Sequence, residues 1–382
     1  MSEVLSVSPI AASSMSEELA SLGQAHVKVL GLGGGGSNAI NRMIELGLTG
    51  VEFIAANTDA QALQSSLAPT RLQLGPRVTR GLGAGGDPKI GAAAAMESSR
   101  EIARALSGAD MVFLTAGMGG GTGTGAAAVA AEIAREVGAV VVAIVTMPFT
   151  FEMSRRSRNA MEGVRQLQPH THTLITVPND RLLQVVPREV SLEVAFRLAD
   201  DVLRQGVQGI SELITRAGLV NVDFAHVREL MLRGGGALMA IGLGEGHKMA
   251  RSAVRQALHH PLVGVDSLEQ ASGILLHFTG GEDLTLFEIS EAVEELRESL
   301  SPEADIVFGA TTEPAMAGRT QAILIVTGIG GRPVPTMAAA GDATEADLPT
   351  TTLHAAVPAE RDLDLPAFLR RRVMLGSSGG AG

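Results

Sequence analysis

A run of seven small residues, Gly-Gly-Gly-Thr-Gly-Thr-Gly at positions 119–125, constrains this chain more than any other feature. Such a run cannot pack a core, but its backbone N–H groups can close around an anion. The apolar segment 110–116 before it indicates a buried strand, and the segment from Ala126 to Val137 after it indicates a helix. Strand, glycine loop and helix in this order predict a phosphate site, because the helix N-terminus adds partial positive charge. No lysine follows the loop, so it is not the usual P-loop.

The composition of the chain argues against several classes of function. Its 382 residues provide room for two domains and a tail, and its net charge of −11 argues against nucleic acid as the main partner. The absence of Cys, Trp and Tyr leaves no disulfide framework, no thiol nucleophile and few rings on which bases could stack. No apolar stretch is long enough to span a membrane, and residues 1–26 resemble neither a signal peptide nor a transit peptide. We therefore expect a soluble, cytoplasmic protein without direct membrane insertion.

The order of the segments predicts an α/β fold with a doubly wound, mainly parallel sheet. Strand-like and helix-like segments alternate over residues 27–190, which we expect to form a nucleotide-binding domain. One long connecting helix is expected within residues 191–218, because an apolar stripe runs from Leu192 through Phe196 to Ile214. Residues 219–330 mix helices with strands and predict a second, smaller α+β domain.

The two ends of the chain differ from this pattern. We expect residues 1–26 to be a flexible extension, residues 331–362 a disordered linker and residues 373–382 a glycine-serine tail. Between linker and tail, residues 363–372 form a short amphipathic motif, with Leu365, Phe368 and Leu369 on one face and three arginines beside them. The motif predicts a peptide that docks on a partner protein.

Further glycine-rich segments accompany the run at 119–125. Gly31, Gly33 and Gly36 fit the dinucleotide fingerprint G-x-G-x-x-G, and a third run occupies residues 81–86. The fingerprint alone would suit a nicotinamide-dependent dehydrogenase, but that activity leaves the run at 119–125 unexplained. Several such loops suit a chain of phosphates that is approached from more than one side.

The order of these segments resembles FtsZ, the bacterial homologue of tubulin. The resemblance covers about residues 27–330, and the motif at 363–372 is similar to the C-terminal peptide of the family. It implies a cytoplasmic GTPase that binds GTP or GDP with Mg²⁺ and assembles head to tail into the filaments of the cell-division ring, tethered to the membrane by division proteins that bind residues 363–372. The motifs that carry the resemblance are Gly33-Gly-Gly-Gly36, Asn57-Thr-Asp-Ala-Gln61, Thr79-Arg-Gly-Leu-Gly-Ala-Gly85, Gly119 to Gly125, Pro148-Phe-Thr-Phe-Glu152, Pro178-Asn-Asp-Arg-Leu-Leu183 and Asn221-Val-Asp223.

The resemblance also implies roles for individual residues. Glu152 would bond the ribose, Arg156 would reach the γ-phosphate, and Asn179 and Asp200 would read guanine while Phe196 stacks on it. Phe196 and Asp200 also support this role directly, because they are four positions apart on a helix and a carboxylate can accept both N1–H and N2–H of guanine. The ordinary alternative places Phe196 in the apolar stripe and Asp200 on a solvated face. The implied phosphate-binding set is Gly34, Gly35, Asn38, Gly85, Gly120, Gly121, Thr122, Gly123 and Thr124.

The loop after the long helix would complete GTP hydrolysis on the next subunit, according to the same resemblance. It runs Asn221-Val-Asp223-Phe-Ala-His226, where the N-x-D-x-x-D pattern of the family ends in a carboxylate. Neutral imidazole is a poor partner for Mg²⁺, and protonated imidazole repels the cation. We therefore expect Asp223 to keep some activity and His226 to reduce it by roughly ten- to a thousand-fold. A filament-forming paralogue with little or no hydrolysis is the alternative, and Asn221 or Asp223 could also simply cap the helix that begins near Phe224.

Met153 and two pairs of histidines also bear on the expected site. Met153 stands where the family has glycine, which predicts a loop forced away from positive φ and leaves the placement of Glu152 and Arg156 open. The pairs His170/His172 and His259/His260 lack acidic or cysteine partners nearby, so no residue is expected to act as a metal ligand.

Overall fold

The computed structural model describes residues 25–329 apart from 186–189, 217, 234, 264–267 and 269. Within these residues, ten strands form one hydrogen-bonded sheet in the order β3-β2-β1-β4-β5-β6-β7-β10-β8-β9. The extension up to residue 24, the linker 331–362, the peptide 363–372 and the tail 373–382 lie outside the described residues. The strands are β1 (Val27–Leu32), β2 (Glu52–Asn57), β3 (Thr70–Gln73), β4 (Met111–Gly117), β5 (Val140–Met147), β6 (Thr173–Pro178), β7 (Gly236–Glu245), β8 (Gly273–Gly280), β9 (Asp305–Thr312) and β10 (Arg319–Ile329).

Helices connect these strands and cover the sheet. They alternate with the strands over the N-terminal half, as the segment order predicted. The helices are α2 (Gly33–Glu45), α3 (Ala60–Gln64), α4 (Pro76–Thr79), α5 (Pro88–Glu97), α6 (Ser99–Leu106), α7 (Thr122–Glu136), α8 (Ser154–Leu167), α9 (Asn179–Leu182), α10 (Leu192–Thr215), α11 (Phe224–Leu232), α12 (Met249–Leu258) and α14 (Leu286–Glu298), with short 3₁₀ turns at Thr150–Glu152, Gln168–His170, Leu183–Val185 and Pro314–Met316.

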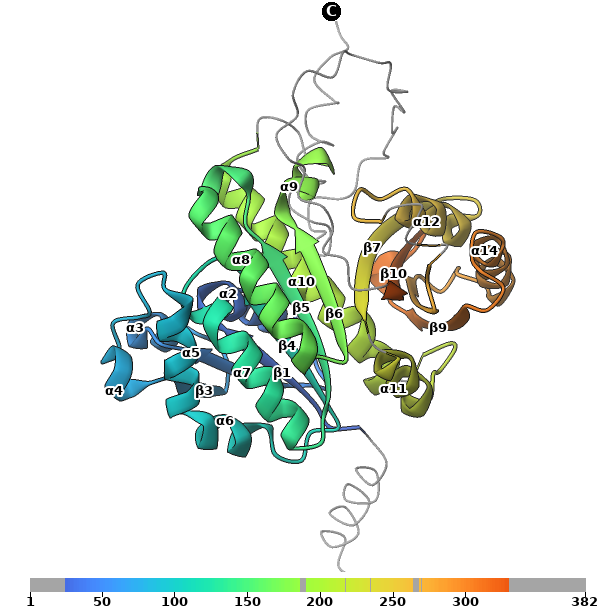
Figure 1. Cartoon of the computed structure of the whole chain (residues 1–382). Helices are drawn as coiled ribbons and strands as arrows, with labels where there is room; N and C mark the ends of the chain where they lie inside the picture. Colours follow the sequence, from blue (N-terminus) through green and yellow to red (C-terminus); the bar gives the residue numbers. More distant parts are fainter. Residues whose placement is uncertain are drawn as a thin grey trace, which may run out of the picture.

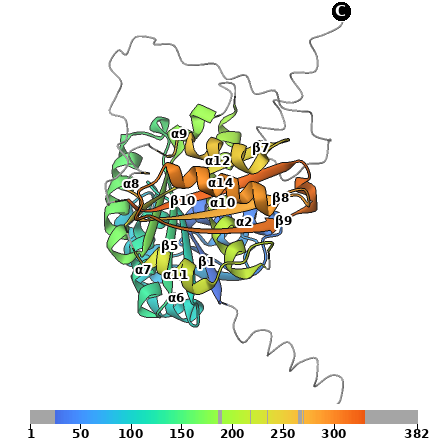
Figure 2. The ribbon, with the colours of Figure 1, turned by 90° about the vertical axis from the view of Figure 1, so that its right-hand side faces the viewer.

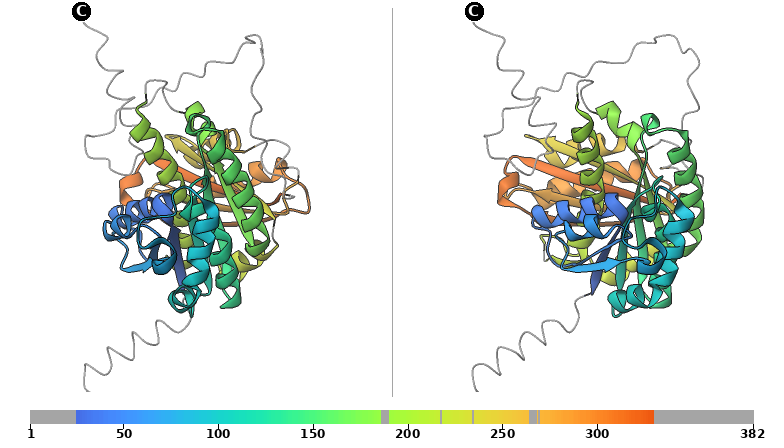
Figure 3. Two further views of the ribbon diagram at one scale, coloured as in Figure 1. Left: turned by 60° about the vertical axis from the view of Figure 1, so that its left-hand side comes forward. Right: turned by 90° about the vertical axis from the view of Figure 1, so that its left-hand side faces the viewer.

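The N-terminal half is the doubly wound parallel sheet that the sequence predicted. All neighbouring pairs among β1 to β6 are parallel. Because side chains alternate across a strand, Val29 and Phe113 pack on one face with α2 and α10, while Leu30 and Leu114 pack on the other face with α5, α6, α7 and α8. Figure 3 shows the helices of this half as an outer layer over the sheet. Their connections leave the carboxyl ends of the parallel strands available for a site.

The C-terminal half continues the same sheet with mixed strand directions. β10 is antiparallel to both β7 and β8, and β9 is parallel to β8. Helices α12 and α14 lie over these strands (Figure 2). A separate cluster of buried apolar residues packs between these helices and the strands. The two halves join through the parallel pairs Leu174–Gly236 and Ile175–Ala237 of β6 and β7. The expected smaller α+β unit is therefore present, as a continuation of the first sheet.

Helix α10 lies between the two halves (Figure 1). It runs from Leu192 to Thr215, within the range that the sequence predicted, and the Ser191 hydroxyl accepts the Val194 N–H at its start. A Cβ at Gly206 would lie 2.9 Å from the Met239 sulfur, and one at Gly209 would lie 2.9 Å from Ile323 Cδ1. These glycines let the strands approach the helix closely.

The apolar stripe of α10 is not wholly buried. Leu192 and Phe196, which we expected at its start, are exposed, and the buried part begins with Ala195 and Leu198. The first turns of the helix are therefore covered less than the rest of it.

Candidate functional site: a glycine-rich pole and a distant loop

Two helix N-termini meet at the carboxyl ends of β1 and β4. The sequence predicted helices from Asn38 and from Ala126, but α2 begins at Gly33 and α7 at Thr122, about a turn earlier, so glycines form their first turns. A Cβ at Gly33 would lie 2.8 Å from the Gly123 nitrogen, and one at Gly35 would lie 3.1 Å from the Gly117 backbone. Glycine is therefore required for the two termini to approach this closely. Together they form a pole of backbone N–H groups suited to phosphate.

The glycines assigned to phosphate binding divide into two kinds. An added Cβ would meet nothing within 4 Å at Gly34, Gly85 or Gly120, so these three face open space. At Gly121 and Gly123 it would instead lie within 3 Å of Ala84 Cβ and the Gly117 carbonyl oxygen, respectively. The first group can approach a ligand, whereas the second group holds the loops together.

Some polar side chains at this pole form hydrogen bonds with other residues of the chain. The hydroxyls of Thr122 and Thr58 lie 2.6 Å apart, and the buried Thr124 hydroxyl accepts the Gly119 N–H at 2.8 Å. Thr124 therefore shapes its own loop, and Thr58 is a member of the site that the residue-by-residue assignment omitted. Asn38 is exposed on α2.

The segment 149–156 contradicts one expectation. Met153 keeps a positive φ of +77°, with its side chain 76% exposed, so the residue adopts the glycine-like conformation that we expected it to lose. Glu152 Oε1 accepts the Phe149 N–H at 2.9 Å, and Glu152 Oε2 pairs with the Arg156 guanidinium at 2.6 Å. A Cβ at Gly119 would lie 2.9 Å from the Arg156 carbonyl oxygen, which places Arg156 beside the phosphate pole.

Three phenylalanines meet at the N-terminal end of α10. The rings of Phe149 and Phe151 stack with centroids 4.9 Å apart, and Phe196 contacts both edge-on. Phe196 is 38% exposed and turns toward this cluster rather than into the core. The residue-by-residue assignment from the sequence omitted Phe149 and Phe151. In a chain with ten phenylalanines and no other aromatic residue, two of them within the motif 148–152 were a usable signal.

Within the described residues, two acceptor side chains near these rings receive no hydrogen bond. Asn179 is 4% exposed, and its Oδ1 has no hydrogen-bond partner within the described part of the chain. Burial and the neighbouring Asp201 carboxylate raise the pKa of Asp200 to about 7. The Thr150 N–H and hydroxyl donate to Asp180, which ties the phenylalanine segment to α9. Paired acceptors beside aromatic rings fit a flat ligand edge with several N–H donors, such as guanine.

The loop after α10 lies elsewhere in the molecule. Asp223 caps α11 by accepting the Ala225 N–H at 2.9 Å, so the expected capping role is confirmed. Asn221 Oδ1 accepts the Gly218 N–H at 2.6 Å, and His226 lies in the first turn of α11. All three side chains are exposed and line a groove of about 600 Å³. The other lining residues are Val220, Val222, Glu229, Leu230, Arg233, Asp305, Ile306, Val307 and Phe308.

The two groups of residues lie at opposite ends of α10. Figure 1 shows α9 near one end of that helix and α11 near the other. From Asp200 to Thr215 the helix axis rises about 22 Å, and the loop continues beyond that point. The structure therefore does not bring Asn221, Asp223 and His226 to the phosphate pole of the same molecule.

The histidine pairs have local roles. The Nδ1 atoms of His172 and His260 accept backbone N–H groups of Val141 and Leu262. Burial lowers the pKa of His260 to about 4. Across the described residues, no group of three or more His, Asp or Glu side chains could hold a metal ion, and no helix is long and apolar enough to cross a membrane.

Comparison with known proteins shows to which family the chain belongs. The model of the Tubulin/FtsZ family GTPase domain matches residues 26–187, and that of the FtsZ family C-terminal domain matches residues 235–330. A point mutant of FtsZ from M. jannaschii is 45% identical over 84% of this chain and 96% of its own, with a TM-score of 0.79. The chain belongs to the FtsZ family.

Other solved structures agree with this assignment. A dimer of FtsZ from M. jannaschii is 42% identical over 88% of this chain and 100% of its own, with a TM-score of 0.78. CetZ1 from Haloferax volcanii, a GDP-bound monomer, is 20% identical over 80% of this chain and 94% of its own, with a TM-score of 0.68, and shares the fold. FtsZ membership accounts for the glycine runs at 31–36 and 119–125 together, so the dehydrogenase alternative is no longer needed.

Proposed function

We propose that this FtsZ-family chain binds GTP and assembles head to tail, so that the loop Asn221–His226 of one subunit acts on the GTP of the next. The main support for this proposal is that the loop and the phosphate pole lie at opposite ends of α10. A site split between opposite ends of a molecule is completed by a heterologous contact, and repetition of such a contact builds filaments. Hydrolysis would then depend on assembly.

The residues at the phosphate pole and beside the three phenylalanines offer a complementary group for each part of GTP. The N-termini of α2 and α7 would bind the phosphates, with Gly34, Gly85 and Gly120 as the points of closest backbone approach. Arg156 would reach the γ-phosphate, and Glu152 would hold Arg156 and bond the ribose. Asn179 and Asp200 would accept the N–H groups of guanine while Phe196 covers the base. Mg²⁺ fits here as an ion held mainly by the phosphates, as is common at nucleotide sites.

In the loop, Asp223 is the residue suited to orient a water molecule. One of its oxygens accepts the Ala225 N–H, and the side chain is exposed at the start of α11. His226 lies one turn further along, where the family pattern has a second carboxylate. Replacing that carboxylate by imidazole removes an oxygen acceptor near the reacting phosphate, so we expect a reduced rate.

The cellular role is proposed from family membership. FtsZ from M. jannaschii has been solved as a dimer and CetZ2 from Haloferax volcanii as a GTPγS-bound protofilament. By analogy, this chain would form the filaments of the cytoplasmic division ring. Residues 363–372 would bind the proteins that tether the ring to the membrane.

Phosphate release from GTP with Mg²⁺, measured over a range of protein concentrations, tests the proposal. We expect the rate per subunit to rise from near zero above a threshold concentration, because the active site forms on assembly. Asp223→Asn should abolish release while unfolding stays unchanged, since asparagine also caps helices well. A rate per subunit that is independent of concentration would place the complete site within one molecule and refute the proposal.

His226 supports a second candidate, a filament that binds GTP and hydrolyses it very slowly or not at all. The same experiment distinguishes the two. GTP-dependent filaments that sediment without releasing phosphate would identify this second function.

A further inference from the structure

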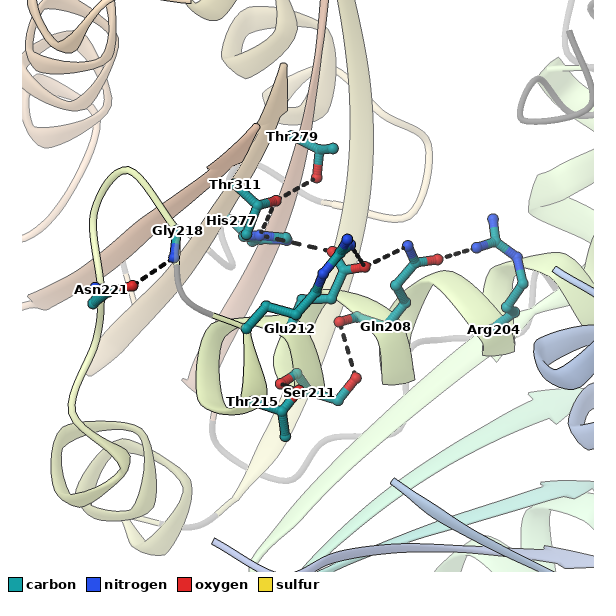
Figure 4. A network of polar contacts seen from close by, with 11 residues as sticks. Arg204, Gln208, Ser211, Glu212, Thr215, Gly218, Asn221, His277, Thr279 and Thr311 are labelled. Carbon is teal, nitrogen blue, oxygen red and sulfur yellow. Dashed lines mark hydrogen bonds and ion pairs between the residues drawn. The ribbon is translucent and has the colours of Figure 1, made fainter. Parts of the chain in front are cut away.

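Helix α10 carries a row of polar side chains between the phosphate pole and the loop that follows the helix. Asp201, Arg204, Gln208, Glu212 and Arg216 are spaced three or four residues apart, so they lie along one side of the helix. Arg204 donates to Asp201 at 2.7 Å and also bonds Gln208, Gln208 donates to Glu212 at 2.8 Å, and Arg216 donates to Glu212 at 3.0 Å. Figure 4 shows Arg204, Gln208 and Glu212 of this row next to His277 and Thr311 of the C-terminal half.

Glu212 is the buried centre of this row. Its side chain is only 3% exposed, yet it accepts hydrogen bonds from Gln208 and from the Arg216 guanidinium. A buried carboxylate is tolerated only when its charge and lone pairs are satisfied. The orientation of Glu212 is therefore closely fixed by its neighbours.

Across the helix surface, Glu212 faces His277 of β8. His277 is 1% exposed, and its Nε2 lies 3.2 Å from the Thr311 hydroxyl of β9 and 3.9 Å from Glu212 Oε2. Burial, with a further contribution from Arg216, lowers the pKa of His277 to about 3, so the ring is neutral. A proton on Nε2 would point toward both oxygen atoms, which leaves Nδ1 as an acceptor without a partner inside the described chain.

The same piece of β9 holds the loop. Val220 and Ala310 exchange backbone hydrogen bonds at 3.3 and 3.2 Å, and Ala310 precedes Thr311. A Cβ at Gly218 would lie 2.2 Å from the Ala310 carbonyl oxygen, so the loop backbone rests directly on this strand. His277 thus fixes β9 one residue away from the point where the loop is attached.

We propose that Glu212 and His277 are positioning residues that hold residues 218–223 in the geometry needed to act on a neighbouring subunit. They bind the end of α10 to β8 and β9, and the loop spans these elements. This inference rests on the proposed function for its consequence in turnover, but its structural part stands on the contacts alone.

Three variants of helix α10 test the role of Glu212 in the full-length protein. Glu212→Ala should lower turnover per assembled subunit by roughly ten- to a hundred-fold, because small displacements of a catalytic group have effects of that size. GDP affinity should stay within about twofold, since Asp200 and the glycine loops are unchanged. Glu212→Gln keeps the length and an acceptor for Gln208, so it should recover most of the activity. Glu193→Ala removes an exposed carboxylate paired with Arg197 on the same helix and is the matched control.

Thr311→Val provides an isosteric test if Glu212→Ala does not fold. It removes the hydroxyl beside His277 without changing volume, and we expect a loss of turnover of about three- to ten-fold with unchanged GDP affinity.

Backbone hydrogen exchange of the peptide covering 218–226 gives a readout independent of hydrolysis. We expect exchange to accelerate at least about tenfold in Glu212→Ala and Thr311→Val, and to stay native in Glu193→Ala and nearly so in Glu212→Gln. If the unsubstituted protein does not hydrolyse GTP but exchange still accelerates in these two variants, the positioning role is supported and the proposed hydrolysis is refuted. Native exchange and native turnover in both Glu212→Ala and Thr311→Val would overturn the inference.

Discussion

Asp200 has a carboxyl group whose protonation should control recognition of the base. Burial and Asp201 raise its pKa to about 7, so the acid form is favoured in the unliganded protein below that pH. An acid with a raised pKa stabilises the fold at low pH and loses that contribution as pH rises toward 7. Guanine has the opposite requirement, because its two N–H groups need the ionised carboxylate. We therefore expect GDP affinity to rise with pH by up to about tenfold per unit below pH 7.

Titration calorimetry with GDP between pH 5.5 and 8 measures this dependence. Asp200→Asn is the control, since it cannot ionise and should retain only the slope that comes from the phosphates of GDP. Identical slopes in the native protein and in this variant would contradict the assignment of Asp200 to the base.

Met153 is a second residue with a measurable consequence. Its φ of +77° and ψ of 150° fall in a region that is nearly restricted to glycine, at a cost of about 1–3 kcal/mol. Met153→Gly should therefore increase the free energy of unfolding by about 1 kcal/mol, after the greater flexibility of glycine in the unfolded chain is subtracted. Urea denaturation would measure this gain in the free energy of unfolding, provided that the m-value is unchanged. Met153→Ala keeps a Cβ and should show no comparable gain, and equal effects of the two substitutions would exclude backbone strain as the cause.

His226→Asp should raise phosphate release by roughly ten-fold or more without changing GTP affinity, because it restores an oxygen acceptor next to Asp223. The side chain is exposed in the first turn of α11, so the substitution should not disturb packing. Ala225→Asp adds the same charge one position away and controls for a general electrostatic effect. If the two variants hydrolyse GTP at the same rate, position 226 does not limit the reaction.

The sequence predicted the site unevenly at this scale. Phe196 and Asp200 could be proposed because helical spacing places them on the same side of α10. The positive φ of Met153 could not, because a loop conformation that the surrounding structure imposes overrides local preference. The pairing of Glu152 with Arg156 and the missing donor for Asn179 depend on atomic distances that a linear pattern does not contain.

At the scale of elements, two glycines in helix first turns should respond in opposite ways to alanine. A Cβ at Gly34 meets nothing within 4 Å, so Gly34→Ala should leave stability nearly unchanged and weaken GDP binding about tenfold by filling the phosphate space. A Cβ at Gly125 would lie 1.9 Å from the Pro88 carbonyl oxygen, where α7 packs against α5. Gly125→Ala should therefore lower the free energy of unfolding by about 3 kcal/mol.

Thermal unfolding and GDP binding of the two variants separate these effects. An equal loss of stability in Gly34→Ala and Gly125→Ala would contradict this prediction. That outcome would mean that Gly34 is required for packing rather than for approach to the ligand.

Most elements were predicted from periodicity, with characteristic errors. The starts of α2 and α7 were placed late because glycine disfavours helix in isolation, whereas here close packing of backbones requires it. Helix α5 was not predicted, since Pro88 to Glu97 is rich in alanine and has no clear polar face. The exposed start of α10 could not be foreseen, because burial depends on which elements pack around the helix in the folded chain.

At the scale of the whole molecule, the two halves share an apolar core. One buried cluster contains strand residues of both halves, such as Phe113 and Ile325, together with Leu203 and Val207 of α10. We therefore expect a single cooperative unfolding transition, with equal calorimetric and van't Hoff enthalpies. Saturating GDP should move the whole transition upward, because the ligand binds only the folded state. Two resolved peaks, of which GDP shifts only one, would contradict this coupling.

The division into two units was predicted from the change in segment pattern near residue 219. Their joining into one sheet was not predictable, because the contact between β6 and β7 consists of two residue pairs far apart in sequence. Likewise, the phosphate pole and the loop lie at opposite ends of α10 because of the direction that this helix takes in the folded chain. The expected domain boundaries and the roles assigned to the site residues stay predictions.

The way the loop is attached has a consequence for how such a protein can change over generations. Its attachment to β9 at Val220 uses backbone atoms, and its turn is closed by Asn221 and Asp223. The imidazole of residue 226 makes no hydrogen bond or ion pair with the described residues and contributes nothing to holding the loop in place. If the proposed function holds, mutation at this position would change the lifetime of the polymer while every subunit keeps its shape, so timing would evolve separately from the fold.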